Sequence, residues 1–407
     1  MKLARFGGLA AALTVGVLTL AACGTDDNSS TSSTAGTTTA AATSAESSSA
    51  ASSAGSETSS AGSATGSASE TSGASGAALT FEGEGFTCAE GELLSSGSSA
   101  QGKVMAQWIS DYNTKCNATI NDYGGGGSGK GRTDFIANQT DFAGSDSAMK
   151  DDQLTEAKDT RCGGADAINL PMVTGPIALA YNVTGVDNLV LDAKTLVGIF
   201  GGTITTWNDP AIAALNPDAT LPAEGIQSVH RSEDSGTTDN FTKYLIAAGE
   251  WSFEGGQAWT APGGTGAQGS DGVAKAVAGT VGSIGYVEWG FAKDNSLNIA
   301  QIDNGSGAVE LTGESAGKAV GAAEITGTAP DLTLSLDYAT QEAGAYPIIL
   351  VTYEIVCSAN NGDKAELVKS FLGWTATDGQ TELDSLGAAP LPADIQAQVV
   401  ESIKSIA

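Results

Sequence analysis

Apolar residues after about position 79 follow two alternating spacings along the chain. Val104, Trp108 and Tyr112 recur at helical spacing, which predicts an amphipathic helix. Short apolar runs flanked by turn residues indicate strands, and they occupy 118–120, 177–181, 284–287 and 348–351. Helical patterns return around 135–136, at 365–375 and at 395–406. Strands that alternate with helices predict an α/β fold with largely parallel sheets.

Three loops rich in Ser and Gly each lead into a predicted helix. They are SSGSSAQGKVMAQW with Ser98 and Ser99, YGGGGSGKGRTDFIA with Ser128, and EDSGTTDNFTKYL with Ser235. A helix N-terminus offers unpaired N–H groups and a partial positive charge, and a Ser hydroxyl adds another donor. At any single loop a plain Ser N-cap is the simpler interpretation. Three such loops and Arg231 together favour an oxyanion-binding cradle.

The second loop also nearly matches a nucleotide-binding P-loop. Gly124, Gly129 and Lys130 fit the G-x-x-x-x-G-K spacing. However, Gly131 stands where a Ser or Thr would ligate magnesium, and no apolar run ending in a suitable Asp follows. This pattern disfavours a nucleotide site.

The only histidine, His230, lies five residues before Ser235 and raises the alternative of nucleophilic catalysis. A catalytic serine needs a histidine base and a third group that orients it, and here no G-x-S-x-G elbow surrounds Ser235. We therefore interpret His230 as a strand-end residue that points away from Arg231, and we expect no enzymatic activity.

The N-terminus has the pattern of an export signal. Lys2 and Arg5 precede an apolar stretch at 7–20 that is short for a membrane span. The stretch ends in Leu-Ala-Ala-Cys, which resembles a bacterial lipobox in which the cysteine is lipidated. We predict a lipoprotein signal peptide at 1–22 and lipidation of Cys23.

The next segment, 23–78, is predicted to be a disordered tether. It consists mostly of Ser, Thr, Ala and Gly, with no aromatic residue and no Lys or Arg. Such a segment cannot bury enough apolar surface to offset the entropy of ordering it. About 55 residues of this composition reach on the order of 40 Å.

Charge excludes some functions of the folded part. The chain of 407 residues has 47 acidic and 18 basic residues, a formal net charge of -29. No basic surface could neutralise a nucleic-acid backbone, so we expect no nucleic-acid partner. An anionic ligand would have to be held by local donors against an unfavourable overall field.

Four further cysteines follow Cys23, namely Cys88, Cys116, Cys162 and Cys357. An even number outside the cytoplasm predicts two disulfides, and three pairings are open. The absence of a C-x-x-C pair and the single histidine argue against zinc. We expect no metal and no other cofactor.

From about position 93 to the C-terminus the sequence resembles the periplasmic-type phosphate-binding proteins of bacterial high-affinity phosphate ABC importers. The stretches that carry the resemblance include GSS at 97–99, GSG at 127–129, ANQTDFAGSDSAM, WNDPAIAALNP, HRSEDSGTTDNF, DGVAKAVAGTVGSIGYVEW and YPIILVTYEIV. The resemblance implies a two-domain periplasmic-binding-protein fold of type II, with the ligand in the interdomain cleft and two hinge crossings.

The same resemblance implies a ligand set. The positions that match the family's phosphate ligands are Ser99, Ala100, Ser128, Asp146, Arg231, Ser235, Gly236 and Thr237. Glu233 stands where an acid commonly pairs with the arginine. Ser99 replaces the usual Thr, and Ala100 departs from the frequent Phe, which matters little if the ligand uses only its N–H.

The implied domains are residues 79–172 with 347–407 as domain I, and 173–346 as domain II. The crossings fit near 171–174 and 346–347. Of the three disulfide pairings, Cys88 with Cys116 is our first choice because both flank the first helix of domain I. Cys162 then pairs with Cys357.

Asp146 is the unusual member of this set because a carboxylate repels an anion. Its presence suits a ligand that carries a proton to donate, as phosphate does at neutral pH and sulfate does not. An unpaired acceptor facing sulfate would cost several kcal/mol. Without the family match, an N-cap or surface aspartate would be the simpler interpretation.

The function expected from the sequence is therefore capture of inorganic phosphate by a monomeric lipoprotein on the outer face of the bacterial cytoplasmic membrane. Its partners would be the permease subunits of the importer and their cytoplasmic ATPase. Alternatives are a receptor for another tetrahedral oxyanion such as arsenate, an extracellular phosphatase, and an adhesin suggested by the tether. A sensing paralogue of the importer receptor also fits the sequence.

Overall fold

The computed structural model describes residues 85–407. The predicted signal peptide, Cys23 and the tether lie outside the described residues. Within 85–407 no helix is both long enough and apolar enough to cross a membrane.

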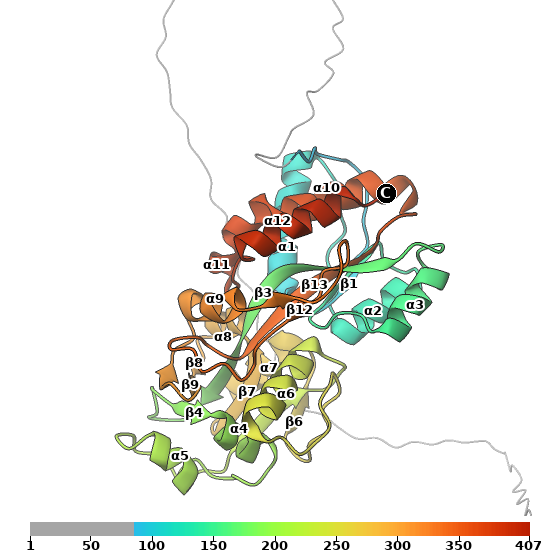
Figure 1. The fold of residues 1–407 in the computed structure, drawn as a ribbon. Helices are drawn as coiled ribbons and strands as arrows, with labels where there is room; N and C mark the ends of the chain where they lie inside the picture. The colour runs from blue at the N-terminus through green and yellow to red at the C-terminus, as the bar shows by residue number, and fades with distance from the viewer. Residues whose placement is uncertain (1–84) are drawn as a thin grey trace, which may run out of the picture. The chain divides into compact units, whose positions relative to one another are not determined.

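One mixed sheet runs through the described part of the chain, in the order β1-β2-β13-β3-β7-β5-β6 (Figure 1). The strands along this path are β1 (Ser95–Gly97), β2 (Phe142–Ser145), β3 (Ala167–Asn182), β5 (Gln227–Arg231), β6 (Thr265–Ala267), β7 (Ser283–Glu288) and β13 (Ile349–Cys357), and an eighth strand, β8 (Asn298–Ile299), pairs with β3 beside it. At its two ends the strand pairs β1–β2, β7–β5 and β5–β6 are parallel. In the middle, β13 is antiparallel to β2 and β3, and β3 is antiparallel to β7. The expectation of largely parallel sheets was therefore wrong at the centre.

The long strand β3 causes this arrangement. Fifteen of its sixteen residues are buried, because the run AINLPMVTGPIALAY is almost wholly apolar. Its first part pairs with β13 and its last six residues pair with β7. A single strand therefore belongs to two sheet regions, and each region has its own hydrophobic core.

The two cores define two lobes. Lobe I surrounds Trp108, Phe142 and Phe371, and its main helices are α1 (Gly102–Cys116), α10 (Ala365–Ala376) and α12 (Ala393–Lys404). Lobe II surrounds Phe200 and Phe241 with Tyr286, and its main helices are α4 (Ala193–Phe200), α6 (Gly236–Gly249) and α7 (Gly269–Gly279). The helices predicted at 365–375 and 395–406 are α10 and α12, whereas 118–120 forms no strand.

Shorter elements complete the two lobes. Lobe I also contains α2 (Ser128–Ile136), α3 (Asp151–Thr160), η1 (Gly362–Lys364), η2 (Asp378–Glu382) and α11 (Leu383–Leu386). The segment between β3 and β13 adds β4 (Val190–Asp192), α5 (Pro210–Leu215), α8 (Trp289–Asp294), β8 (Asn298–Ile299), β9 (Gln301–Asp303), β10 (Ala308–Val309), α9 (Gly313–Gly321), β11 (Glu324–Ile325) and β12 (Leu334–Ser335). The hairpin of β11 and β12 contacts the lobe I core through Leu332 and hydrogen-bonds to Tyr353 of β13.

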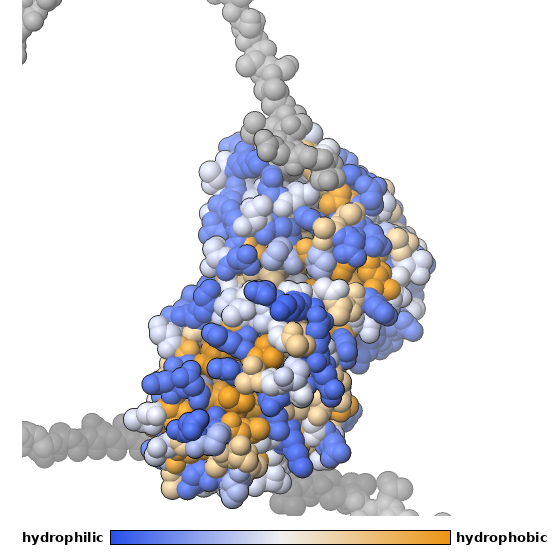
Figure 2. All heavy atoms as spheres, turned by 60° about the vertical axis from the view of Figure 1, so that its left-hand side comes forward, coloured by the Kyte–Doolittle hydropathy of each residue, from blue (hydrophilic) through white to orange (hydrophobic). Residues whose placement is uncertain are grey.

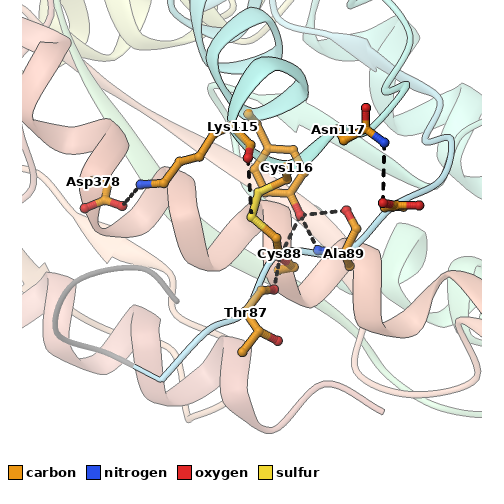
Figure 3. Close-up of a disulfide and its surroundings, with 10 residues drawn as sticks. Thr87, Cys88, Ala89, Lys115, Cys116, Asn117 and Asp378 are labelled. Atoms are coloured by element: carbon orange, nitrogen blue, oxygen red, sulfur yellow. Dashed lines mark hydrogen bonds and ion pairs between the residues drawn. A yellow bond between two sulfur atoms is a disulfide. The ribbon is translucent and has the colours of Figure 1, made fainter. Parts of the chain in front are cut away.

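Both disulfides are in lobe I and have the pairing that was our first choice. Cys88 is bonded to Cys116 at the end of α1, where Lys115 also forms an ion pair with Asp378 (Figure 3). Cys162 is bonded to Cys357, which is 195 residues away in the sequence. The second bond joins the end of α3 to the end of β13, so it ties the C-terminal part of lobe I to its N-terminal part.

Hydrophobic residues on the viewed surface of the described part occur in small groups separated by hydrophilic ones (Figure 2). Within 85–407 the exposed large hydrophobic side chains are Leu94, Ile246 and Val281. Leu94 precedes β1 in lobe I, whereas Ile246 lies on α6 and Val281 lies between α7 and β7, both in lobe II.

Candidate functional site

The site is built where parallel strands end. β1 and β2 are paired in register, Gly97 with Gly144, so the residues that follow them are neighbours. Ser98 and Ser99 follow β1, and Asp146 follows β2. In lobe II, β5 ends at Arg231 beside β6, and α7 begins just beyond β6. The carboxyl ends of parallel strands therefore bring together loops that are far apart in the sequence, as is usual for ligand sites in α/β proteins.

Asp146 is the buried centre of the lobe I half. Its side chain belongs to a residue that is only 3% exposed. Oδ1 accepts hydrogen bonds from Ser98 Oγ at 2.5 Å and Thr352 Oγ1 at 2.7 Å, and Oδ2 accepts one from Ser128 Oγ at 3.1 Å. Burial raises the pKa of Asp146, while these hydroxyls and Arg231 oppose the rise. The alternative of a surface or N-cap aspartate does not apply.

Arg231 is the buried centre of the lobe II half, and its residue is 2% exposed. Nε donates to Glu233 Oε1 at 2.8 Å, so Glu233 pairs with the arginine in the way the resemblance implied. Nη1 donates to Thr237 Oγ1 at 3.3 Å, and Nη2 donates to Ser99 Oγ at 2.8 Å. The guanidinium group thus lies between the two lobes. Glu233 is the carboxylate that balances its charge, whereas its partners Thr237 and Ser99 are uncharged.

Ser99, which belongs to lobe I, also contacts the N-terminus of α7 in lobe II. Its Oγ accepts from the backbone N–H of Ser270 at 3.2 Å, which is in the first turn of α7. The N–H of Gly269 donates to Glu233 Oε1 at 2.9 Å. The N-terminus of α7 therefore supports both the arginine's carboxylate partner and Ser99, and neither contact was predicted from the sequence.

The N-terminus of α6 faces Asp146 directly. Ser235 is the N-cap, and its Oγ accepts from the Thr238 N–H at 3.3 Å while its hydroxyl proton is not used by this bond. The N–H groups of Gly236 and Thr237 lie in the first turn and have no acceptor one turn earlier in the helix. A Cβ on Gly236 would lie 2.5 Å from Asp146 Cβ and 2.6 Å from Ser128 Oγ, so this close approach requires glycine.

The other predicted positions also lie in this region. Ser128 begins α2, has no N-cap role, and accepts from Asp146 N–H at 3.0 Å. The N–H of Ala100 donates to Ser98 Oγ at 3.0 Å. All eight positions that match the family's ligands therefore lie at strand ends, in the loops that follow them, or in the first turns of helices.

Two residues that hold Asp146 were missed by sequence reasoning, namely Ser98 and Thr352. Ser98 belongs to the first Ser-rich loop, but only its neighbour Ser99 was selected. Thr352 lies in the buried run ILVTYEIVC, where every residue of β13 is buried. A polar residue inside such a run has to be hydrogen-bonded, and this signal could have identified it.

The structure also shows the surroundings of His230 and of the P-loop-like segment, the two features that raised alternative functions. The His230 ring stacks on Trp259 with centroids 5.1 Å apart, and its Nδ1 lies 2.9 Å from the carbonyl oxygen of Arg231. Lys130 of the P-loop-like segment pairs with Asp134 in its own helix. A Cβ on Gly131 would lie 2.6 Å from Gly97 Cα, so glycine there permits α2 to pack against β1.

Two more buried carboxyl groups lie near Asp146. Burial, followed by the charge of Asp146, raises the pKa of Glu288 to about 8. Burial is also the main cause that raises the pKa of Glu354 to about 8. At neutral pH these two acids are therefore largely uncharged, which limits the negative charge close to the site.

These two groups make stability depend on pH. Their ordinary pKa is 4.5, so between about pH 4.5 and 8 the folded protein binds more protons than the unfolded chain. Their contribution to stability is present below this window and is lost as the pH rises through 8. We expect the Tm of a Glu288→Gln/Glu354→Gln variant to rise relative to the unsubstituted protein as pH increases from 5 to 8.

Thermal unfolding followed by circular dichroism at several pH values measures this difference. Glu366→Gln, which changes an exposed carboxylate on α10, is the matched control and should give a flat difference. A Tm difference in the double variant that stays constant from pH 5 to 8 would show that both carboxylates are charged in the folded protein.

The arrangement of donors is suited to a tetrahedral oxyanion. The guanidinium of Arg231, the hydroxyls of Ser99 and Thr237, and the first N–H groups of α6 converge from both lobes. Such groups bind an anion without requiring an equal number of positive charges. The carboxylate of Asp146 is the exception, because it requires a ligand that can donate a proton.

Similarity to known proteins shows the family to which this chain belongs. A profile of the PBP superfamily domain matches residues 28–378. Phosphate-binding protein PstS 3 of Mycobacterium tuberculosis is 38% identical over 416 residues, with complete coverage of both chains. PstS 2 of the same organism is 37% identical over 413 residues, also with complete coverage, and PstS of Xylella fastidiosa is 34% identical over 73% of this chain and 80% of its own. This chain belongs to the phosphate-binding protein PstS family.

Solved structures have the same fold. A high-affinity periplasmic phosphate-binding protein bound with phosphate has a TM-score of 0.63 at 22% identity, covering 76% of this chain and 93% of its own. A phosphate ABC transporter substrate-binding protein from Clostridium perfringens, described as putative, has a TM-score of 0.55 at 18% identity, covering 74% of this chain and all of its own. The α/β periplasmic-binding-protein fold expected from the sequence is therefore confirmed.

Proposed function

We propose that this protein captures inorganic phosphate outside the cytoplasm and delivers it to an ABC importer, without catalysing a reaction. The observation that carries the proposal is the pairing of a buried acceptor, Asp146, with the donor set around Arg231. A monoprotonated or diprotonated oxyanion satisfies both kinds of group at once. The family relationship supports the same ligand, because the full-length relatives are named phosphate-binding proteins.

The proposed ligand contacts are the eight positions that match the family. They are Ser99, Ala100, Ser128, Asp146, Arg231, Ser235, Gly236 and Thr237. Support comes from their placement at strand ends and helix starts around one point between the lobes. Glu233 supports the arginine through the hydrogen bond to Nε and does not contact the anion.

The proposed movement is closure of the two lobes on phosphate. We assign residues 79–172 and 347–407 to the first moving body and 173–346 to the second, with crossings at 171–174 and 346–347. The change of partner along β3 supports this division, since the strand leaves β13 and joins β7 after Pro176. Two crossing segments permit a hinge motion, and the hydrogen bond between Arg231 Nη2 and Ser99 Oγ would be broken when the lobes open.

The proposed location is the outer face of the cytoplasmic membrane. Cys23 would carry the lipid, and residues 23–78 would let the folded part reach the permease subunits as a monomer. The lipobox-like Leu-Ala-Ala-Cys pattern and the composition of the segment support these assignments.

Isothermal titration calorimetry of the purified full-length protein, stripped of phosphate, tests the proposal. We expect one phosphate to bind per chain, with no heat from sulfate under the same conditions. Binding of both anions would assign the protein to a broader oxyanion class. Absence of phosphate binding would contradict the proposed function, and release of phosphate from a monoester would indicate an enzyme instead.

A further inference from the structure

The two oxygens of Asp146 have different environments. Oδ1 accepts two hydrogen bonds, from Ser98 Oγ at 2.5 Å and from Thr352 Oγ1 at 2.7 Å. Oδ2 accepts one, from Ser128 Oγ at 3.1 Å. Ser98 follows β1, Thr352 lies in the middle of β13, and Ser128 begins α2. Three separate elements of lobe I therefore determine how this carboxylate is oriented.

The three hydroxyls differ in whether their single proton is available to a bound anion. A Ser or Thr hydroxyl has one proton to donate. Ser98 and Thr352 give theirs to Oδ1, so neither can donate to a bound anion in this arrangement. Ser98 Oγ also accepts from the Ala100 N–H at 3.0 Å, a bond that the proposed contact of this N–H with the anion would replace. Both side chains are buried, so water does not compete for these bonds.

Ser128 differs from the other two residues. Its Oγ accepts from the Asp146 N–H at 3.0 Å, so the oxygen remains in place while its own proton can rotate. If that proton turns toward a bound anion, Oδ2 loses its only hydroxyl donor and becomes free to accept a proton from the ligand. Ser128 is thus compatible with direct ligand contact, whereas Ser98 and Thr352 are not.

We propose that Ser98 and Thr352 are positioning residues that determine anion specificity, because they hold Oδ1 of an ionised Asp146 and leave Oδ2 to accept the ligand's proton. The inference rests on the proposed phosphate function and adds two residues to the specificity mechanism. Neither residue is among the positions that match the family's ligands.

The electrostatic surroundings explain why two donors are needed. Asp146 is buried, and burial favours its protonated form. Arg231 and Arg132 face it with positive charge, while Glu288, Glu354 and Tyr123 add negative charge when they ionise. The hydrogen bonds from Ser98 and Thr352 lower the pKa of Asp146 and oppose the effect of burial. Without them the carboxyl group takes up a proton more readily.

A protonated Asp146 would reverse the chemistry of the site. The carboxyl group would then donate a hydrogen bond, and a fully deprotonated anion such as sulfate could accept it. Loss of Ser98 or Thr352 should therefore increase sulfate binding relative to phosphate binding, and the change should be larger at low pH.

The test compares Thr352→Val, which has nearly the same shape, and Ser98→Ala with the unsubstituted protein. Phosphate and sulfate Kd values are measured by calorimetry at pH 5.5 and pH 7.5. We expect the preference for phosphate to fall at least tenfold in each variant at pH 5.5, and less at pH 7.5. Thr352→Ser, which keeps the hydroxyl, should retain the preference. Thr375→Val, which removes a buried hydroxyl of α10 from the same lobe, is the matched control.

A double-variant cycle separates this inference from the proposed function. In an Asp146→Asn background, Thr352→Val should not change the preference further, because there is no carboxylate left to hold. If Asp146→Asn narrows the preference but Ser98→Ala and Thr352→Val do not, the inference is wrong while the proposed function stands. Equal losses of affinity for both anions, at either pH, would also contradict it. An unsubstituted protein that does not bind phosphate would remove the basis of both.

Discussion

Arg231→Ala is expected to weaken phosphate binding at least tenfold, which corresponds to about 1.4 kcal/mol. The guanidinium is a buried cationic group that hydrogen-bonds to both Ser99 and Thr237. Its removal also leaves the Glu233 carboxylate without its partner next to the ligand. Lost attraction and new repulsion act in the same direction, so this substitution should have the largest effect on affinity. Titration calorimetry with phosphate measures the change directly.

Two further variants distinguish the shape of the arginine from its charge. Arg231→Lys keeps a positive charge but loses the planar fork that contacts Ser99, Thr237 and Glu233 together, so its affinity should lie between those of the alanine variant and the unsubstituted protein. Lys158→Ala removes one positive charge from the exposed end of α3 and should leave affinity unchanged. An unaltered phosphate affinity in Arg231→Ala would exclude this residue from the site.

Asp146→Asn is expected to narrow the discrimination between phosphate and sulfate. The asparagine keeps the size of the side chain but offers an amide that can donate as well as accept. Sulfate, which has no proton, would then meet a donor where it now meets a buried charged acceptor. Leaving such an acceptor unpaired costs several kcal/mol, so sulfate should gain affinity while phosphate loses a charge-assisted hydrogen bond.

Competition binding, with phosphate displaced by increasing sulfate, measures this ratio. Asp166→Asn changes an exposed carboxylate of the same lobe and is the matched control, since it alters net charge equally without touching the site. Discrimination that stays the same in Asp146→Asn would mean that specificity has another origin, for example the geometry of the helix N-termini.

Local sequence was sufficient to find one kind of site residue. Ser235 and Ser128 were identified because a strand-like run, a Ser/Gly loop and a helix occur in that order. Those three features determine which backbone N–H groups lack a partner within their own helix. The family resemblance then selected Asp146, and the position of Cys88 and Cys116 on either side of the first helix selected the disulfide pairing from the three that were open.

Other features could not be read from local patterns. The central antiparallel strands were missed because a wholly buried run carries no periodicity that distinguishes its direction. The hydrogen bond between Thr352 and Asp146 joins residues 206 positions apart. The raised pKa values of Glu288 and Glu354 follow from burial, and burial depends on how β7 and β13 pack between the lobes.

The sequence by itself therefore identified only part of the donor set, because helix starts, Ser hydroxyls and the arginine are properties of short segments. The tertiary structure alone decided which oxygen of Asp146 is held and which can accept a proton. That distinction depends on β13 lying antiparallel to β2, which brings Thr352 against Asp146 from the opposite end of the chain. The physical reason is that hydrogen-bond donors are encoded residue by residue, whereas their partners are set by the packing of distant strands.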